Sequence, residues 1–139
     1  MNVDITDTLV RTAIDAIRNA YVEHGGIAAG ACIMASDGTI YSGCSIDHPV
    51  QKLSMNAETV ALARALADGK RDFDAVAIVA DIEGFYVPDE VTCQFLAEFE
   101  VQEIVMADLE GNVKTVKLDA LMPYKQRRRP RENFFENDF

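Results

Sequence analysis

The sequence predicts an α/β protein of three layers (α-β-α), in which helices cover both faces of a mixed five-stranded sheet. In several segments apolar residues recur every three to four positions, which is the spacing of a helix with one buried face. Other segments are short apolar runs bounded by glycine-containing turns, as is typical of strands. A chain of 139 residues has the length of one domain, and we expect that domain over residues 1–123, followed by a tail over 124–139.

The expected order is α-β-β-α-β-α-β-β. In chain order, the elements are a helix over 4–22, strands over 27–34 and 39–41, a helix over 57–66, a strand over 75–80, a helix over 88–99, and strands over 103–107 and 113–118. Asp4 is expected to cap the first helix, and Asp37-Gly38 is typical of a tight hairpin. The apolar run 75–80 has no polar face, which predicts a strand covered on both sides. Pro88 suits the first turn of its helix.

Composition excludes several classes of partner. The net charge of −10 argues against a nucleic-acid polymer, because such binding relies on lysine and arginine contacts to phosphates. No apolar run approaches the roughly 20 residues of a membrane span, and the acidic N-terminus does not resemble a secretory signal. The three scattered cysteines, Cys32, Cys44 and Cys93, suit a reducing compartment. We therefore expect a cytoplasmic protein whose partner is a small molecule.

Polar side chains gather at two of the predicted helix starts. One start contains Asn56 and Glu58, and the other contains Asp89, Thr92 and Cys93. Because the N-terminus of a helix offers oriented N–H groups and the positive end of a dipole, such starts favour binding of polar or anionic groups.

These segments resemble the cytidine deaminase family, in particular its small nucleoside and blasticidin-type deaminases. The resemblance extends over nearly the whole chain and is carried by residues 20–22, 30–31, 37–44, 56–58, 75–81, 94–99 and 121–123. It implies a cytidine-deaminase-like fold. It also implies a zinc ion held by His or Cys in [HC]-x-E and by both cysteines of P-C-x-x-C, with the Glu moving protons.

Against these motifs, the sequence keeps the Glu as Glu58 and the Pro as Pro88, and places Asn56, Asp89 and Thr92 at the ligand positions. Zinc prefers thiolate, imidazole or carboxylate donors, so only Asp89 is suitable. We therefore expect neither a metal ion nor another cofactor.

The catalytic candidates are Glu58, Asp89 and Cys93. Glu58 and Asp89 can form a carboxylate pair, one protonated and one ionised, which is a known arrangement for acid–base chemistry. Glu58 can equally be a first-turn carboxylate stabilised by the helix dipole. Cys93 is either a nucleophile near a helix start or, as we favour, a small buried residue.

The resemblance also suggests ligand-binding residues. Relatives bind the ribose hydroxyls with N-x-E after the second strand, where this chain has Ser45 and Asp47. Ile27 falls where relatives often carry an aromatic that packs on the base. Asn56 and Thr92 complete the predicted substrate-binding set.

The first interpretation is a cytidine-deaminase-like protein without zinc, which binds a small nucleoside-like or heterocyclic metabolite or serves as a non-catalytic subunit. One alternative is an enzyme with a metal-free acid–base mechanism. Another is a divergent deaminase, a hydrolase acting on a cytidine-like substrate through an unusual metal. Separately, His48 together with Asp89 and Glu58 could hold a harder metal such as iron or manganese. The resemblance further implies a homo-oligomer, either a dimer or a tetramer. The tail over 124–139 is expected to be basic surface, or a clasp between subunits that uses its phenylalanines.

Overall fold

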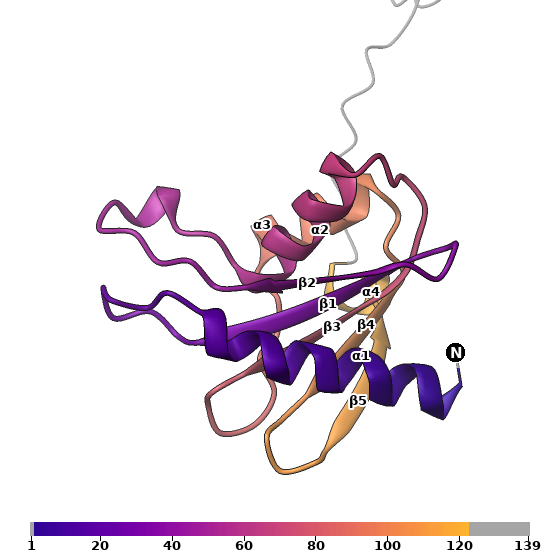
Figure 1. Cartoon of the computed structure of the whole chain (residues 1–139), viewed down its shortest axis with the longest axis horizontal. Coiled ribbons are helices and arrows are strands. Elements are labelled where there is room, and N and C mark those ends of the chain that lie inside the picture. Colours follow the sequence, from indigo (N-terminus) through magenta and orange to yellow (C-terminus); the bar gives the residue numbers. More distant parts are fainter. Residues whose placement is uncertain (1, 123–139) are drawn as a thin grey trace, which may run out of the picture.

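A computed structural model describes residues 2–122, which form one mixed five-stranded sheet between layers of helices (Figure 1). The strands are β1 (Ala29–Ala35), β2 (Ile40–Cys44), β3 (Phe73–Ala80), β4 (Glu103–Ala107) and β5 (Val113–Lys117). The α-helices are α1 (Val3–Ala16), α2 (Ala57–Ala67), α3 (Glu90–Glu98) and α4 (Leu118–Leu121), with 3-10 turns η1 (Ile17–Asn19) and η2 (Gln51–Leu53). The predicted order is confirmed, with α4 as an addition, and the predicted tail over 124–139 lies outside the described residues.

The sheet has the order β2-β1-β3-β4-β5. The β3–β4 pair is parallel and the other pairs are antiparallel, so the sheet is mixed as predicted. Seven of the eight residues of β3 are buried, which agrees with the continuous apolar run that predicted a strand covered on both faces.

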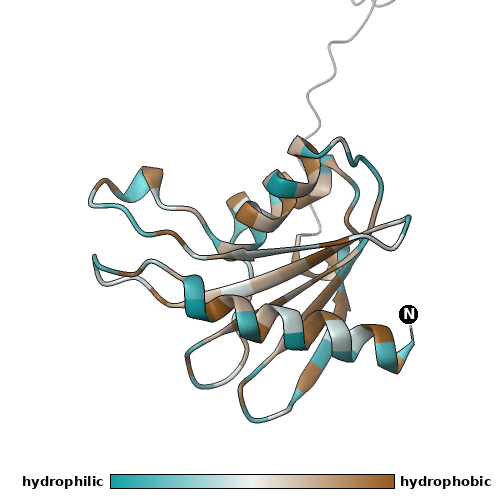
Figure 2. Cartoon of the chain, in the orientation of Figure 1, coloured by the Kyte–Doolittle hydropathy of each residue, from teal (hydrophilic) through white to brown (hydrophobic). Residues whose placement is uncertain are grey.

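Alternate residues of the central strands enter two separate cores, because successive side chains of a strand point to opposite faces. Cys32 of β1 faces α1, together with Leu9 and Ala13 of that helix. Ile33, the next residue of β1, packs with Leu62 of α2 in the larger core, to which α3 and α4 also contribute. Figure 2 shows the corresponding colouring: hydrophilic and hydrophobic residues alternate around α1, whereas the central strands are mainly hydrophobic.

Two glycines let helices approach the sheet closely. A Cβ atom at Gly30 would lie 1.9 Å from the carbonyl oxygen of Ala13, and one at Gly43 would lie 2.4 Å from both the carbonyl oxygen of Ala57 and the amide nitrogen of Ala61. The α2 helix, which carries Glu58, can therefore reach its position only because residue 43 has no side chain.

Three helix ends differ from the prediction. Asn2, and not Asp4, caps α1 by accepting a hydrogen bond from the amide of Ile5 at 2.8 Å. The regular helix ends at Ala16 and passes into η1, short of the predicted residue 22. Pro88 lies before the α3 helix and not in its first turn, because Asp89 is the N-cap residue.

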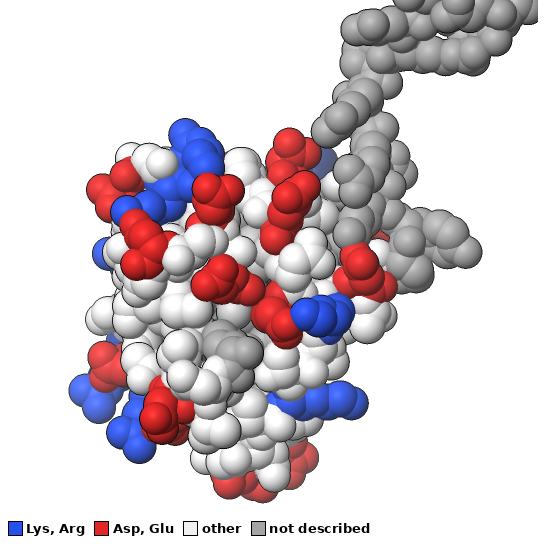
Figure 3. All heavy atoms as spheres, turned by 90° about the vertical axis from the view of Figure 1, so that its right-hand side faces the viewer, with Lys and Arg blue, Asp and Glu red and all other residues white. Residues whose placement is uncertain are grey.

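The distribution of charged side chains and the lengths of the helices relate to the partners that the sequence predicted. Basic side chains lie among acidic ones on the face of the molecule that Figure 3 shows. Among residues 2–122, no helix is both long enough and apolar enough to cross a membrane.

The close approach at Gly43 gives a test of the packing. Gly43→Ala should lower the free energy of unfolding by about 2 to 3 kcal/mol, because α2 must move away from β2. Gly69→Ala is the control, since its methyl group would meet nothing within 4 Å and its cost is limited to a left-handed backbone, about 1 kcal/mol. Urea unfolding measures both. Equal destabilisation by the two substitutions would contradict the packing argument.

Candidate functional site

A cavity of about 350 Å³ opens beside the N-terminal ends of α2 and α3, which pack together on one face of the sheet. Its walls come from residues 22–29, from residues 45–57 and from the loop that leads into α3. Five predicted site residues line it: Ile27, Ser45, Asp47, Asn56 and Asp89. The fold therefore brings together side chains from three separate parts of the sequence.

Asn56, Asp89 and Thr92 form one hydrogen-bonded cluster. The Asn56 side-chain amide donates to Oγ1 of Thr92 at 2.7 Å and makes a longer contact, 3.5 Å, with Oδ2 of Asp89. Asp89 caps α3 by accepting a hydrogen bond from the amide of Thr92 at 2.8 Å. Burial opposes ionisation of Asp89, but the hydrogen bonds from Thr92 and Asn56 outweigh it and lower the pKa of the carboxyl below its ordinary value.

Glu58 lies in the first turn of α2 and is fully buried. Neither of its carboxyl oxygens accepts a hydrogen bond from another residue in the described part of the chain. Burial raises the pKa of Glu58 to about 7; its own backbone N–H opposes the rise, and the negative charge of Asp89 adds to it. A buried carboxyl without a donor is costly, so Glu58 is the group in this region that most needs a partner.

Cys93 points into the larger core and is 1% exposed. Its thiol donates a weak hydrogen bond to the carbonyl of Pro88, at 3.7 Å. Burial raises the pKa of Cys93 to about 11, and the charges of Asp89 and Glu58 act in the same direction. The residue is therefore a thiol at neutral pH, a form that is a poor nucleophile and a poor metal ligand.

The donors at the inherited ligand positions do not suit the zinc ion that the sequence resemblance implies. Asn56 directs its amide nitrogen toward the other two side chains, and an amide N–H is a donor that cannot bind a cation. Thr92 offers a hydroxyl, which leaves one carboxylate, that of Asp89. In the described part of the chain, no three His, Cys, Asp or Glu side chains are grouped closely enough to hold a metal ion. His48 instead accepts a hydrogen bond from the amide of Val50 through Nδ1.

Ser45 and Asp47 hold the wall of the cavity. The Ser45 hydroxyl accepts from the amide of Ala29 at 3.0 Å and donates to the carbonyl of Ile27 at 2.9 Å. Oδ2 of Asp47 accepts from the amides of His24 and Gly26 at 2.9 and 3.0 Å. The polar groups that we predicted to bind a diol are thus engaged mainly with the backbone, while Ile27 keeps 47% of its surface exposed at the cavity wall.

Sequence reasoning missed Tyr86, an aromatic residue that lines the cavity from the loop before α3. Burial raises the pKa of Tyr86 to about 12, with the charges of Glu58 and Asp89 contributing, so its hydroxyl stays protonated. The resemblance had placed the family's aromatic at Ile27, whereas the aromatic residue of this cavity is Tyr86. The signal in the sequence that could have identified Tyr86 is its position two residues before Pro88, next to the predicted start of the helix.

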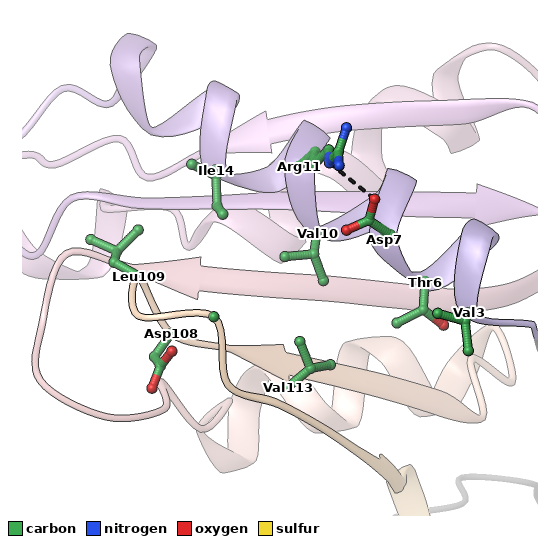
Figure 4. A pocket seen from close by; sticks show the side chains of 10 residues that line it. Val3, Thr6, Asp7, Val10, Arg11, Ile14, Asp108, Leu109 and Val113 are labelled. Carbon is green, nitrogen blue, oxygen red and sulfur yellow. Dashed lines mark ion pairs between the residues drawn. The ribbon is translucent and has the colours of Figure 1, made fainter.

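A second cavity, of about 500 Å³, lies between α1 and the turn that joins β4 to β5 (Figure 4). Its walls are mostly apolar, and its Arg11 guanidinium is paired with Asp7 at 3.0 Å. The Asp108 carboxylate accepts hydrogen bonds from Glu110 and Asn112 and so holds the turn. This cavity contains none of the predicted site residues, and we place the candidate site at the ends of α2 and α3.

The buried Glu58 predicts a pH dependence of stability. Its pKa rises from an ordinary 4.5 to about 7 on folding, so the folded state holds a proton that the unfolded state has lost. The free energy of unfolding should therefore fall by about 3 kcal/mol as the pH rises from about 4.5 through 7. Urea unfolding of wild type and Glu58→Gln measures this, because the variant lacks the titrating group. Parallel pH profiles of the two proteins would contradict the assignment.

Comparison with known proteins agrees with the family that the sequence resembles. Residues 11–111 match the family described as cytidine deaminase-like. The chain is 34% identical over 119 residues to a cytidine deaminase of Sporosarcina psychrophila, covering 84% of this chain and 88% of that protein. It is 30% identical over 117 residues to one of Halalkalibacterium halodurans, covering 83% and 89%.

A solved structure of this family has the same fold. A crystal structure of cytidine deaminase from Burkholderia pseudomallei superposes with a TM-score of 0.83 at 28% identity, covering 91% of this chain and 100% of that chain. The resemblance inferred from the sequence is thus confirmed, and the chain belongs to the cytidine deaminase-like family.

Proposed function

We propose that this cytidine deaminase-like protein binds a small nucleoside-like or other polar heterocyclic molecule in the cavity without the help of zinc, either as a binding protein or as a non-catalytic subunit. The observation that carries the proposal is the cluster of Asn56, Asp89 and Thr92. These side chains bond to one another and to the start of α3, at the positions where the family's motifs place zinc ligands.

The cluster differs from a metal site in its charge and in the direction of its hydrogen bonds. A zinc site needs ligands that offer lone pairs to one point, and it is strengthened by their negative charge. Here the amide N–H groups of Asn56 occupy that point and already satisfy the oxygens of Thr92 and Asp89. Binding a cation would require Asn56 to turn and these hydrogen bonds to break.

The cavity suits a flat polar molecule. A volume of about 350 Å³ is in the range of small-ligand sites. Tyr86 supplies an aromatic surface, and Asp89 supplies a carboxylate at the wall. Polar side chains, among them Gln51, Ser54 and Asp89, line much of the remaining wall, so the cavity suits a polar molecule better than a purely apolar one.

A metal-free acid–base enzyme is the second candidate. The environments of Glu58 and Asp89 move their pKa values in opposite directions, up and down respectively. Such a separation favours one protonated and one ionised carboxyl group near neutral pH. The buried thiol of Cys93 is better explained as part of the core than as the nucleophile of this mechanism.

Exposed apolar side chains on the loops around the cavity favour the expected homo-oligomer, a dimer or a tetramer. These side chains are Tyr21, Ile27, Ile46, Val50, Leu53, Met55 and Val87. Large apolar side chains left exposed near one another are often covered by another subunit. Light scattering would detect the assembly, and a mass of 15.3 kDa would contradict it.

The metal content of the protein tests the first half of the proposal. Protein purified from zinc-supplemented cells without chelators should contain less than about a tenth of an equivalent of zinc, because one carboxylate is too few donors. A variant with Asn56→Cys, Asp89→Cys and Thr92→Cys restores three thiolates in the family's spacing and should retain about one equivalent. Elemental analysis measures both. A full equivalent of zinc in the wild-type protein would refute the proposal.

A thermal-shift screen over nucleosides and free heterocycles tests the second half. A ligand present at about 100 times its dissociation constant should add about 2.7 kcal/mol to the free energy of unfolding. Tyr86→Ala should weaken the binding of that ligand, whereas Tyr41→Ala, in β2 and outside the cavity wall, is the control. Chromatography of the same mixtures should recover the ligand unchanged. Conversion that disappears in Glu58→Gln would instead favour the acid–base enzyme, and the absence of any shift would contradict binding.

A further inference from the structure

The 22–27 segment forms one wall of the cavity, and little apolar burial holds it in place. All but one of its six residues line the cavity, and Ile27 keeps 47% of its surface exposed there. Within residues 2–122, the hydrogen bonds that join this segment to the rest of the chain go to the side chains of Ser45 and Asp47. A segment with so few other contacts is expected to open easily, so its position depends on these two side chains.

Asp47 makes two of these hydrogen bonds and also reaches a second part of the cavity wall. Its Oδ2 atom accepts from the amides of His24 and Gly26 at 2.9 and 3.0 Å. Its Oδ1 atom accepts from the hydroxyl of Ser54, another lining residue, at 3.3 Å. One carboxylate thus connects two segments that are distant in the sequence and that both line the cavity.

We infer that Asp47 is a positioning residue of the cavity: its carboxylate holds the 22–27 segment in place as a wall, without itself touching an occupant. The inference rests on the proposed function, since it concerns binding in the same cavity. Asp47 is 7% exposed, and three polar groups of the protein already donate to its carboxylate, which has about four acceptor sites. This role differs from the direct contact to a diol that the sequence predicted.

The space around the carboxylate agrees with this role. A Cβ atom at Gly26 would lie 3.0 Å from both Cγ and Oδ2 of Asp47, which is closer than ordinary van der Waals contact. A methyl group at residue 26 would therefore push the carboxylate away from the amides that donate to it. The close approach of the 22–27 segment to Asp47 thus requires a glycine at this position.

Asp108 provides a matched control, because it holds a different turn in the same way. Its Oδ1 atom accepts hydrogen bonds from the amides of Glu110 and Asn112 at 3.0 and 2.8 Å, and Asp108 is 8% exposed. It lines the second cavity, beside α1, and not the candidate site. Asp108→Ala should therefore loosen a comparable turn without changing the candidate site.

Backbone NMR relaxation of the full chain tests the hold on the wall without any ligand. In Asp47→Ala the order parameters of residues 22–27 should fall from about 0.85 to below about 0.6, because the segment loses its hydrogen bonds to the carboxylate. Asp47→Asn, which keeps an oxygen acceptor, should restore most of the order, and Asp108→Ala should leave it unchanged. Unchanged order parameters in Asp47→Ala would overturn the inference.

Gly26→Ala is a second variant, which decides the matter if Asp47→Ala does not fold. It keeps the carboxylate but displaces it, so the order parameters of residues 22–27 should fall in this variant as well. A wall that stays as ordered as in the wild-type protein would again overturn the inference.

Isothermal titration calorimetry with cytidine and uridine, and with their free bases cytosine and uracil, tests the consequence for binding. Asp47→Ala should weaken nucleoside and base by the same factor, about tenfold, because both meet the loosened wall. Asp108→Ala should leave the affinities unchanged.

Three results of the calorimetry would overturn the inference. They are a loss confined to the nucleosides, which would indicate direct contact with the sugar, wild-type affinities in Asp47→Ala, and an equal loss in Asp108→Ala. In each of these cases the proposed function stands, because the wild-type protein binds. If none of the four probes binds the wild-type protein, the proposed function falls, whereas the order parameters still decide the role of Asp47.

Discussion

The hydrogen bond from the Asn56 amide to the Thr92 hydroxyl links the first turns of α2 and α3, and the character of the site depends on it. Both helices point their N-terminal ends at this position, which favours negative charge there. In a zinc enzyme, thiolates and a metal ion would occupy it. Here a neutral side-chain pair and one capping carboxylate lie there, and hydrogen bonds among them link the two helix ends directly.

The residues at the ligand positions also affect the charge environment of Glu58. In the family's mechanism a metal ion balances the charges near this residue. Glu58 is fully buried here, and burial, with a smaller contribution from the charge of Asp89, raises its pKa to about 7. Its two carboxyl oxygens accept no hydrogen bond from another described residue, so Glu58 is a buried polar group whose hydrogen bonding is incomplete.

Much of the fold and part of the candidate site could be predicted from the sequence. The apolar run around Val76 and Ile78 marked the central strand, and Asp37-Gly38 marked the hairpin, because both signals are local. The motif positions also predicted that Asn56, Asp89 and Thr92 lie close together, as the hydrogen bonds among them show. The engagement of Asp47 with backbone amides and the arrival of Tyr86 at the cavity were not predictable in this way, since each depends on how loops distant in the sequence meet in three dimensions.

The proposed lack of zinc depends most directly on what occupies the space between the N-terminal ends of α2 and α3. Crystals grown in the presence of zinc, with diffraction data recorded on both sides of the zinc absorption edge, locate any such ion. We predict no anomalous peak at this position, with the Asn56 amide directed at Thr92. A tetrahedral peak bounded by Asn56, Asp89 and Thr92 would contradict the account.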